Sequence, residues 1–332
     1  MIARRSASFL LLLVASSLVG AGAACRRDAA SRQGAKGAEE KPIAEVAPPS
    51  PSMTVPETDA SPEAPRGAVT LLEWTLPSPI ERAVVIVPKS RTPEQRFPVV
   101  IALHGRGEAL KGPALGAMGW PRDYALERAF GRLTAPPLVE DDFEGLVAAA
   151  HLAELNRALA EHPFGRLIIA CPYVPDLNLS SAEDVDAYAR ALTTELLPRV
   201  RAETPALASP EATGIDGVSL GGIVALRAGL GQPAVFGAVG ALQPAIHNTG
   251  AAAAELAELA KSARARRPEL KLRLTTSERD SFRRAVTRTS ETWRGAGIAH
   301  DFAVLPGPHD YVFNRGPGAI ELLFWHDQVL AR

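Results

Sequence analysis

The residues best suited to chemistry lie in the stretch "GIDGVSLGGIVAL", which runs from Gly214 to Leu226. Ser219 stands there between Gly217 and Gly221, with a short apolar run before it and a longer apolar run after it. The pattern Gly-x-Ser-x-Gly between a strand and a helix predicts a serine nucleophile, because glycines let the chain bend sharply enough to lift the hydroxyl out of a sheet. The alternative is an ordinary turn whose serine caps the helix.

A serine hydroxyl is a weak nucleophile until a base takes its proton. In this motif the acid and then the histidine follow the serine along the chain. His309, in "LPGPHDYVFNRG" just after the last strand-like run, is therefore the predicted base, whereas His247 precedes every candidate acid. The alternative for His309 is a loop histidine that caps the last helix or faces water.

The third member should be a carboxylate that follows the strand-like run "LKLRLTTS". Asp280, in the next residues "ERDSF", is the predicted acid, since it would fix the tautomer of His309 and stabilise its imidazolium. Glu278 is the second candidate. Asp310 adjoins His309, and neighbouring side chains usually point apart, so we do not favour it. Asp280 could instead be the N-cap of the helix that follows.

Attack on a carbonyl creates an oxyanion, which needs N–H donors. The N–H of Leu220 is one predicted donor, because it opens the helix after the nucleophile and the helix dipole favours negative charge there. The loop "HGRGE" follows the strand-like run "FPVVIAL" and offers a second donor. We expect this to be the backbone N–H of Arg106, with Gly105 as the next choice.

Three residues are candidates for contact with a substrate: Trp120, Tyr173 and Gln243. Each follows a strand-like run on the side where the carboxyl ends of the strands would meet. The alternative for the two aromatic residues is that they simply anchor loops.

Short apolar runs alternate with longer helical patterns from about residue 68 to the end, which predicts a mostly parallel, doubly wound α/β sheet covered by helices on both faces. The strand-like runs are Arg82–Pro88, Phe97–Gly105, Arg166–Pro172, Thr213–Ser219, Phe236–Pro244, Leu270–Ser277 and His300–Gly307. The predicted helices are Leu146–Glu161, Ala182–Glu203, Leu220–Gly231, Ala251–Arg267, Asp280–Gly295 and Gly318–Ala331.

The motifs "LHGRGE", "GVSLGG", "SERDSF" and "LPGPHDY", in this order, resemble those of the putative esterase family of α/β hydrolases. That family includes esterase D-like enzymes, feruloyl esterases, enterochelin esterases and mycolyltransferases. The resemblance covers roughly Val84 to the C-terminus and implies an α/β-hydrolase fold with Ser219, Asp280 and His309 as catalytic triad. The segments "EALKGPALGAMGWPRDYAL" and "YVPDLNLSSAEDVDAY" match nothing that we can assign, which leaves the substrate open.

The N-terminus has the layout of a secretory signal, with Arg4 and Arg5 before an apolar run and small residues after it. The ending "LVGAGAAC" is typical of a bacterial lipoprotein signal, in which Cys25 is lipidated, although Gly22 stands where a larger apolar residue is usual. The alternative is ordinary cleavage after Ala23. A lipidated Cys25 would anchor the protein on a membrane surface of the cell envelope; the alternative is a periplasmic or secreted protein.

Three regions are predicted: a signal peptide over 1–25, a disordered linker rich in Pro, Ala and Glu over 26–67, and a catalytic domain over 68–332. The 332-residue chain has a net charge of −1, which gives no indication of a nucleic-acid partner. Its two cysteines, Cys25 and Cys171, are too few for a disulfide framework. We find no metal-ligand spacing, phosphate loop or dinucleotide fingerprint, so we expect neither a metal nor a cofactor.

The predicted function is a serine hydrolase that cleaves a small-molecule carboxylic ester through an acyl-enzyme. Two alternatives use the same fold. One is an acyltransferase or peptidase on the same triad, and the other is a non-catalytic surface binding protein.

Overall fold

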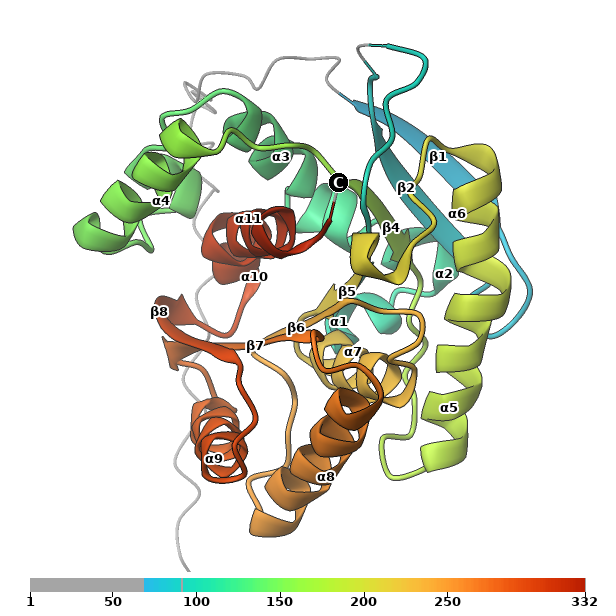
Figure 1. Cartoon of the computed structure of the whole chain (residues 1–332), viewed down its shortest axis with the longest axis vertical. Helices are drawn as coiled ribbons and strands as arrows, with labels where there is room; N and C mark the ends of the chain where they lie inside the picture. Colours follow the sequence, from blue (N-terminus) through green and yellow to red (C-terminus); the bar gives the residue numbers. More distant parts are fainter. Residues whose placement is uncertain (1–68, 91, 332) are drawn as a thin grey trace, which may run out of the picture. The chain divides into compact units, whose positions relative to one another are not determined.

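The computed structural model describes residues 69–90 and 92–331, which form an eight-stranded sheet with helices on both faces (Figure 1). The strands are β1 (Val69–Thr75), β2 (Arg82–Pro88), β3 (Val99–Leu103), β4 (Ile168–Pro172), β5 (Thr213–Gly217), β6 (Ala238–Leu242), β7 (Lys271–Arg279) and β8 (Asp301–Pro308). The predicted signal peptide, Cys25 and the linker lie outside the described residues.

The strand order across the sheet is β1-β2-β4-β3-β5-β6-β7-β8. β2 pairs antiparallel with both β1 and β4, and the pairs from β4 to β8 are parallel. Every residue of β3, β4, β5 and β6 is buried, because helices cover both faces of these central strands. The predicted fold class, a mostly parallel α/β-hydrolase sheet, is confirmed.

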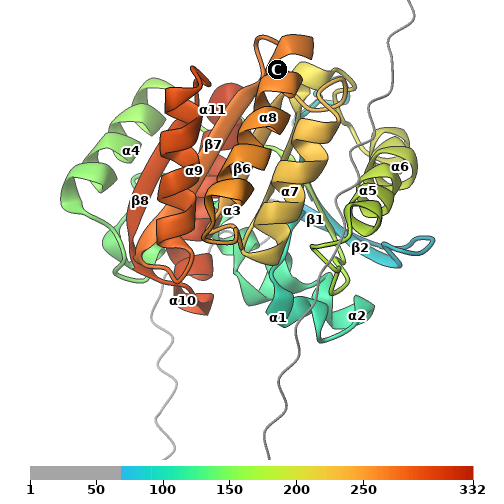
Figure 2. The ribbon, with the colours of Figure 1, turned by 90° about the horizontal axis from the view of Figure 1, so that it is seen from below.

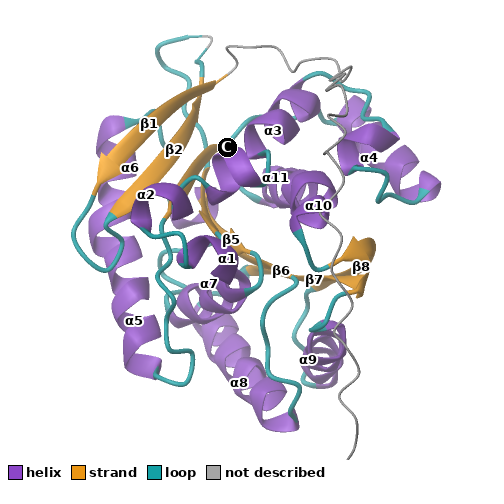
Figure 3. Cartoon of the chain, turned by 180° about the vertical axis from the view of Figure 1, so that it is seen from behind, coloured by secondary structure: helices purple, strands orange, loops and turns teal. Residues whose placement is uncertain are grey.

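Two layers of helices enclose the sheet (Figure 3). One layer contains α5 (Ala182–Ala191), α6 (Leu197–Glu203), α7 (Leu220–Gly231), α8 (Gly250–Arg266) and α9 (Arg283–Gly295). The other contains α3 (Leu126–Thr134), α4 (Ala149–Glu161) and α11 (Ala319–Val329). Figure 2 shows α7, α8 and α9 side by side over the sheet. None of the described helices is both long enough and apolar enough to cross a membrane.

Short helical segments complete the described chain. Three of them are α-helical: α1 (Arg106–Ala109), α2 (Pro113–Gly116) and α10 (Tyr311–Phe313). Three are π-helical turns: Gly119–Asp123, Leu192–Leu196 and Asn314–Gly318. Two are 3-10 turns: Glu140–Phe143 and Pro210–Ala212. The π turn at Leu192–Leu196 joins α5 to α6, so the single predicted helix Ala182–Glu203 is continuous apart from this turn.

The seven predicted strands correspond to β2 to β8, and the six predicted helices are all present. The edge strand β1 is not predicted from the sequence, because it is mostly exposed and lacks a clear apolar run. The helix α3 is not predicted either, although its buried residues Leu126, Ala129, Phe130 and Leu133 follow the helical spacing i, i+3, i+4, i+7. That spacing was the signal that could have revealed α3.

A buried charge cluster ties β5, the strand before Ser219, to the rest of the sheet. The Asp216 carboxylate on β5 accepts hydrogen bonds from Arg273 on β7 at 2.9 Å and from His326 on α11 at 3.1 Å. The other carboxylate oxygen accepts from the Gly217 N–H at 2.7 Å. Asp216, Arg273 and His326 are each at most 3% exposed. A buried carboxylate with all these partners holds β5 in a fixed place, and losing it would remove the ion pair that Arg273 makes at 2.9 Å and leave only Glu321 at 3.9 Å.

We expect Asp216→Ala to lower the free energy of unfolding by about 3–5 kcal/mol, because the Arg273 guanidinium would stay buried with only the Glu321 carboxylate, 3.9 Å away, as its counter-charge. Urea unfolding followed by circular dichroism measures this loss. The exposed Asp186 on α5 supplies a control, since Asp186→Ala should change the free energy by less than about 0.5 kcal/mol. A loss below about 1 kcal/mol for Asp216→Ala would show that the cluster is not a structural tie.

Candidate active site

Ser219 lies at the sharp turn between β5 and α7. Its backbone has φ 57° and ψ −116°, a conformation that costs a residue with a side chain about 1–3 kcal/mol. The surrounding chain holds it there: the Ser219 N–H donates to the Leu242 carbonyl at 3.1 Å, and the Ser219 carbonyl accepts from the Ala245 N–H at 2.9 Å. Both partners belong to the end of β6 or the loop after it, so the neighbouring strand fixes the turn.

The two glycines of the motif are required by close backbone contacts. A Cβ at Gly217 would lie 2.5 Å from the carbonyl carbon of Gly221. A Cβ at Gly221 would lie 2.5 Å from the His104 carbonyl oxygen and even closer to that of Leu103. Real Cβ atoms do not approach backbone atoms so closely, so any side chain at either position would push α7 away from the end of β3.

The predicted triad residues are brought together by the ends of three strands. The distance from Ser219 Oγ to His309 Nε2 is 3.1 Å, and that from His309 Nδ1 to Asp280 Oδ1 is 2.8 Å. These distances allow His309 to take the serine proton while Asp280 fixes its tautomer. The Asp280 side chain is fully buried, whereas 24% of the His309 side chain is exposed.

Asp280 is held by two further donors. Its Oδ2 accepts from the Thr276 hydroxyl at 2.6 Å, and its Oδ1 accepts from the Phe282 N–H at 2.9 Å. The alternative reading of Asp280 as the N-cap of α9 is wrong, because the N-cap is Phe282 and no side chain accepts from the first N–H groups of this helix. Glu278, the second candidate acid, is exposed at the end of β7. Asp310 caps α10 by accepting from the Val312 N–H at 2.9 Å.

Gln243 lies beneath the loop that carries His309. It is fully buried with a positive φ of 43°, and its side-chain amide donates to the Pro308 carbonyl at 2.9 Å and to Ser277 Oγ at 2.7 Å. Gln243 therefore ties the end of β6 to β7 and to the residue before the base. This placement does not support the expected substrate contact, because the side chain has no exposed surface.

The backbone N–H groups of Arg106 and Leu220 lie at the first positions of α1 and α7. The first N–H groups of a helix have no acceptor within the helix, so they can bind an oxyanion. The preceding residue Gly105 lies beside the nucleophile, since a Cβ placed on it would be 3.6 Å from Ser219 Cβ. Gly105 itself is less suited as a donor, because its N–H points to the Tyr124 hydroxyl at 3.3 Å.

His104 fixes the same loop from the inside of the protein. Its Nδ1 lies 2.9 Å from the Gly105 carbonyl oxygen, and its Nε2 accepts from the Val174 N–H at 2.9 Å. These partners require a neutral ring that is protonated on Nδ1. Burial disfavours the charged form and lowers the pKa of His104 to about 4.

Two cavities adjoin Ser219. The wide cavity has a volume of about 480 Å³ and is formed by Arg106, Ser219, Leu220, the segment 176–179 and the loops that carry His247 and Phe282. The Arg106 side chain at its edge is exposed and pairs with Asp176 at 2.8 Å. The narrow cavity has a volume of about 150 Å³ and is formed by the segment 105–108, Tyr124 and the loop from His309 to Asn314.

Trp120 and Tyr173, which were predicted to contact substrate, line neither of these cavities. Trp120 is 1% exposed and packs edge-on against Tyr124 in the core. Tyr173 is 7% exposed, and its hydroxyl donates to the Ala109 carbonyl at 2.8 Å. Both placements favour the alternative that these aromatic residues anchor loops. Among the described residues, no group of three or more His, Cys, Asp or Glu side chains could hold a metal ion.

Comparison with known proteins gives one family and many related structures. Residues 172–312 match the family described as "Putative esterase". A ferulic acid esterase structure superposes with a TM-score of 0.57 at 16% identity, over 79% of this chain and 98% of that one. The S-formylglutathione hydrolase of Staphylococcus aureus has a TM-score of 0.52 at 17% identity, over 80% of this chain and 100% of that one.

A third structure is the enterobactin esterase of Shigella flexneri, with a TM-score of 0.52 at 18% identity over 80% of this chain and 61% of that one. No curated protein matched the chain in sequence. At these identities the structures establish the fold. The family match confirms the resemblance to the esterase family and, with it, the expected class of enzyme, a carboxylic-ester hydrolase.

We expect the stability of the protein to fall as the pH is lowered from about 6.5 to about 4, in part through His104. In this window the unfolded chain binds a proton at residue 104 and the folded protein does not, so acid favours unfolding. The full effect of this residue is about 3 kcal/mol.

Urea unfolding at pH 7.5 and at pH 4.5, for the native sequence and for His104→Asn, measures this contribution. The variant should be less stable at pH 7.5 but should lose less stability on acidification. Equal losses in the two proteins would contradict the assignment of a neutral, buried ring at position 104.

Proposed function

We propose that the protein is a serine carboxylesterase that works through an acyl-enzyme on Ser219, His309 and Asp280. The observation that carries this proposal is the continuous chain of contacts from the Ser219 hydroxyl through both nitrogens of His309 to the buried Asp280. The match of residues 172–312 to an esterase family supports the same chemistry.

In the first half of the reaction, Ser219 Oγ attacks the ester carbonyl and His309 Nε2 takes its proton. The negative charge that develops on the carbonyl oxygen is stabilised by the N–H groups of Arg106 and Leu220. Asp280 stabilises the imidazolium of His309. His309 then gives the proton to the leaving alcohol, and the acyl group stays bonded to Ser219.

In the second half, water enters the site and His309 takes one of its protons. The resulting hydroxide attacks the acyl carbonyl, the oxyanion again binds the two N–H groups, and the acid leaves as Ser219 recovers its proton from His309. No residue in this cycle needs a metal or a cofactor.

The two cavities suggest how an ester would lie. The wide cavity is large enough for a small organic molecule and combines apolar walls, such as Leu179 and Phe282, with polar groups at Asp176 and Asn178. The narrow cavity holds only a small group, since a cavity of this size holds about one benzene ring. We propose that the larger part of the ester occupies the wide cavity.

We also propose that the protein is secreted and held on a membrane of the cell envelope through a lipid on Cys25. The layout of the first 25 residues supports this, and the Pro- and Ala-rich residues up to about 67 would space the catalytic domain from the surface.

We expect Ser219→Ala to lower kcat/KM for p-nitrophenyl acetate by roughly 10⁴-fold or more, because the nucleophile is lost and only the oxyanion donors remain. A fluorophosphonate probe should label the native protein at Ser219 and leave the variant unlabelled. The exposed Ser209 before β5 provides a control, since Ser209→Ala should keep full activity.

Unchanged hydrolysis by Ser219→Ala would overturn the mechanism. If the native protein hydrolyses none of a panel of p-nitrophenyl esters and methyl ferulate but binds one of them in a thermal-shift assay, it is a binding protein. Faster product release in the presence of added alcohols, with formation of new esters, would favour an acyltransferase.

We expect Cys25→Ser to move the protein from the membrane fraction to the soluble fraction of the expressing cells, with kcat unchanged. Loss of the lipid removes the anchor, because each buried methylene contributes about 0.8 kcal/mol to membrane binding. Fractionation with immunoblotting measures the distribution. Equal amounts of both proteins in the membrane fraction would rule out lipidation at this position.

A further inference from the structure

The segment 108–126, which matched no known motif, encloses a buried carboxylate beside the active site. Glu108 is 1% exposed and follows the oxyanion donor Arg106 by two residues. Gly119 lies against it, since a Cβ there would be 2.8 Å from Glu108 Cγ. A buried carboxylate is costly unless it is paired or hydrogen-bonded, so its partners indicate its role.

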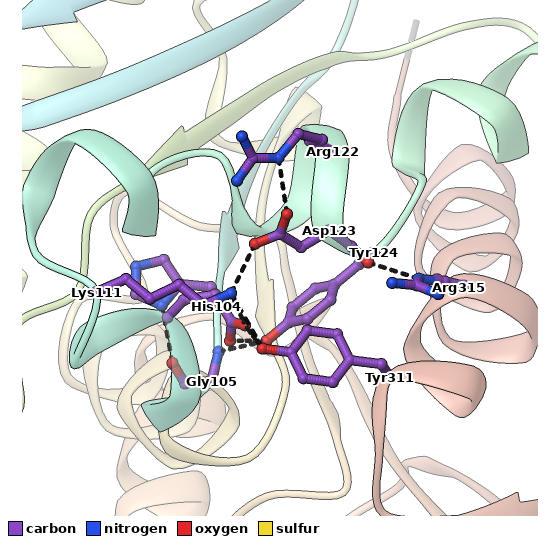
Figure 4. Close-up of polar contacts among 9 residues, drawn as sticks. His104, Gly105, Lys111, Arg122, Asp123, Tyr124, Tyr311 and Arg315 are labelled. Carbon is purple, nitrogen blue, oxygen red and sulfur yellow. Dashed lines mark hydrogen bonds and ion pairs between the residues drawn. The ribbon is translucent and has the colours of Figure 1, made fainter. Parts of the chain in front are cut away.

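Those partners are two tyrosine hydroxyls and a lysine. Glu108 Oε2 accepts from the Tyr124 hydroxyl, and Oε1 accepts from the Tyr311 hydroxyl at 2.5 Å. Lys111 Nζ lies 3.4 Å from Oε1, and it donates to Asp123 at 2.8 Å and to the Tyr311 hydroxyl at 3.1 Å. Figure 4 shows Tyr124 and Tyr311 reaching the cluster from different parts of the chain.

One side of this cluster fixes residues 104–108, which we call the oxyanion loop because they include Arg106. The Tyr124 hydroxyl donates to Glu108 and accepts from the Gly105 N–H at 3.3 Å, while His104 binds the Gly105 carbonyl. Burial and the charge of Glu108 raise the pKa of Tyr124 well above its usual value, so the phenol stays protonated as a donor. The peptide groups on both sides of Gly105 are thereby fixed, and the next N–H is that of Arg106.

The other side holds the loop of the catalytic base. Tyr311 follows His309 by two residues, and its hydroxyl donates to Glu108 on the oxyanion loop. A second link lies close by, where Arg315 Nε donates to the Asp123 carbonyl at 2.9 Å (Figure 4). The two loops face each other across the narrow cavity beside Ser219.

We propose that Glu108 is a positioning residue. By accepting hydrogen bonds from Tyr124 and Tyr311 at the same time, it holds the Arg106 N–H and the His309 ring in fixed positions relative to each other. Glu108 itself does not touch the reacting atoms. The proposal rests on the proposed esterase function, and it assigns a role to a segment that the triad does not use.

The test compares Glu108→Gln, Tyr124→Phe and Tyr311→Phe with the native protein. Active enzyme is counted by fluorophosphonate titration, kcat and KM are measured with p-nitrophenyl acetate, and a phenylboronic acid serves as a tetrahedral analogue. Hydrogen–deuterium exchange of the peptides that cover 104–112 and 306–314 reports the order of the two loops. Glu321→Gln on α11 is the matched control, because Glu321 is also a buried, hydrogen-bonded carboxylate.

We expect Glu108→Gln to lower kcat about tenfold to hundredfold and to change KM less than about threefold. The glutamine NH₂ group is a donor, so only one of the two side-chain atoms can still accept a hydrogen bond from a tyrosine hydroxyl. Boronate affinity should fall by a similar factor, and exchange should rise in both loops. Tyr124→Phe should loosen mainly 104–112, and Tyr311→Phe mainly 306–314. Glu321→Gln should lower the melting temperature but change neither kcat nor exchange in these loops.

Native kcat and unchanged exchange in Glu108→Gln would overturn the proposal. A change in KM alone would overturn it too, because it would make Glu108 a substrate contact. If the native protein hydrolyses no ester, the proposed function fails, yet the exchange experiment still decides whether Glu108 holds the two loops.

Discussion

The strained turn at Ser219 is the constraint on which the rest of the site depends. A serine at φ 57° is unfavourable on its own, so the surroundings must enforce it. They do so through backbone contacts: Gly221 packs against the end of β3, and β6 supplies hydrogen bonds on the other side. The same close backbone packing that bends the chain at Ser219 also places the start of α7 next to the loop after β3. The Ser219 hydroxyl and the N–H groups of Arg106 and Leu220 are therefore positioned by one packing arrangement.

His309 and Asp280 reach Ser219 because parallel strands end at the same edge of the sheet. β7 delivers Asp280 and β8 delivers His309, and their spacing follows from the pairing of the two strands. Polar side chains beneath the edge then fix the details. Gln243 holds the residue before His309, and Thr276 holds Asp280. Buried hydrogen bonds thus fix the positions of His309 and Asp280 at the edge of the sheet.

Much of this could be predicted from sequence, for physical reasons that also explain the failures. Apolar runs predict buried strands, and the residue types just after them predict Ser219, Asp280 and His309 as a group, whose side chains the fold brings into contact. By contrast, Gln243 and Tyr173 come directly after β6 and β4, yet both are buried, because orientation after a strand depends on the local turn. Glu108 could not be recognised at all. Its significance arises from Tyr124 and Tyr311, and only the folded chain brings residues 108 and 311 together.

The ionic cluster around Asp216 has a consequence for how the chain assembles during synthesis. β5 lies in the middle of the sheet, but the charge of its Asp216 is paired with Arg273 and the carboxylate also accepts from His326, and these residues emerge from the ribosome 57 and 110 residues later. Until then, burying β5 would leave the Asp216 carboxylate unpaired in an apolar interior. We therefore expect β5 to be buried only after β7 has been made, and its hydrogen bonds to be completed when α11 follows.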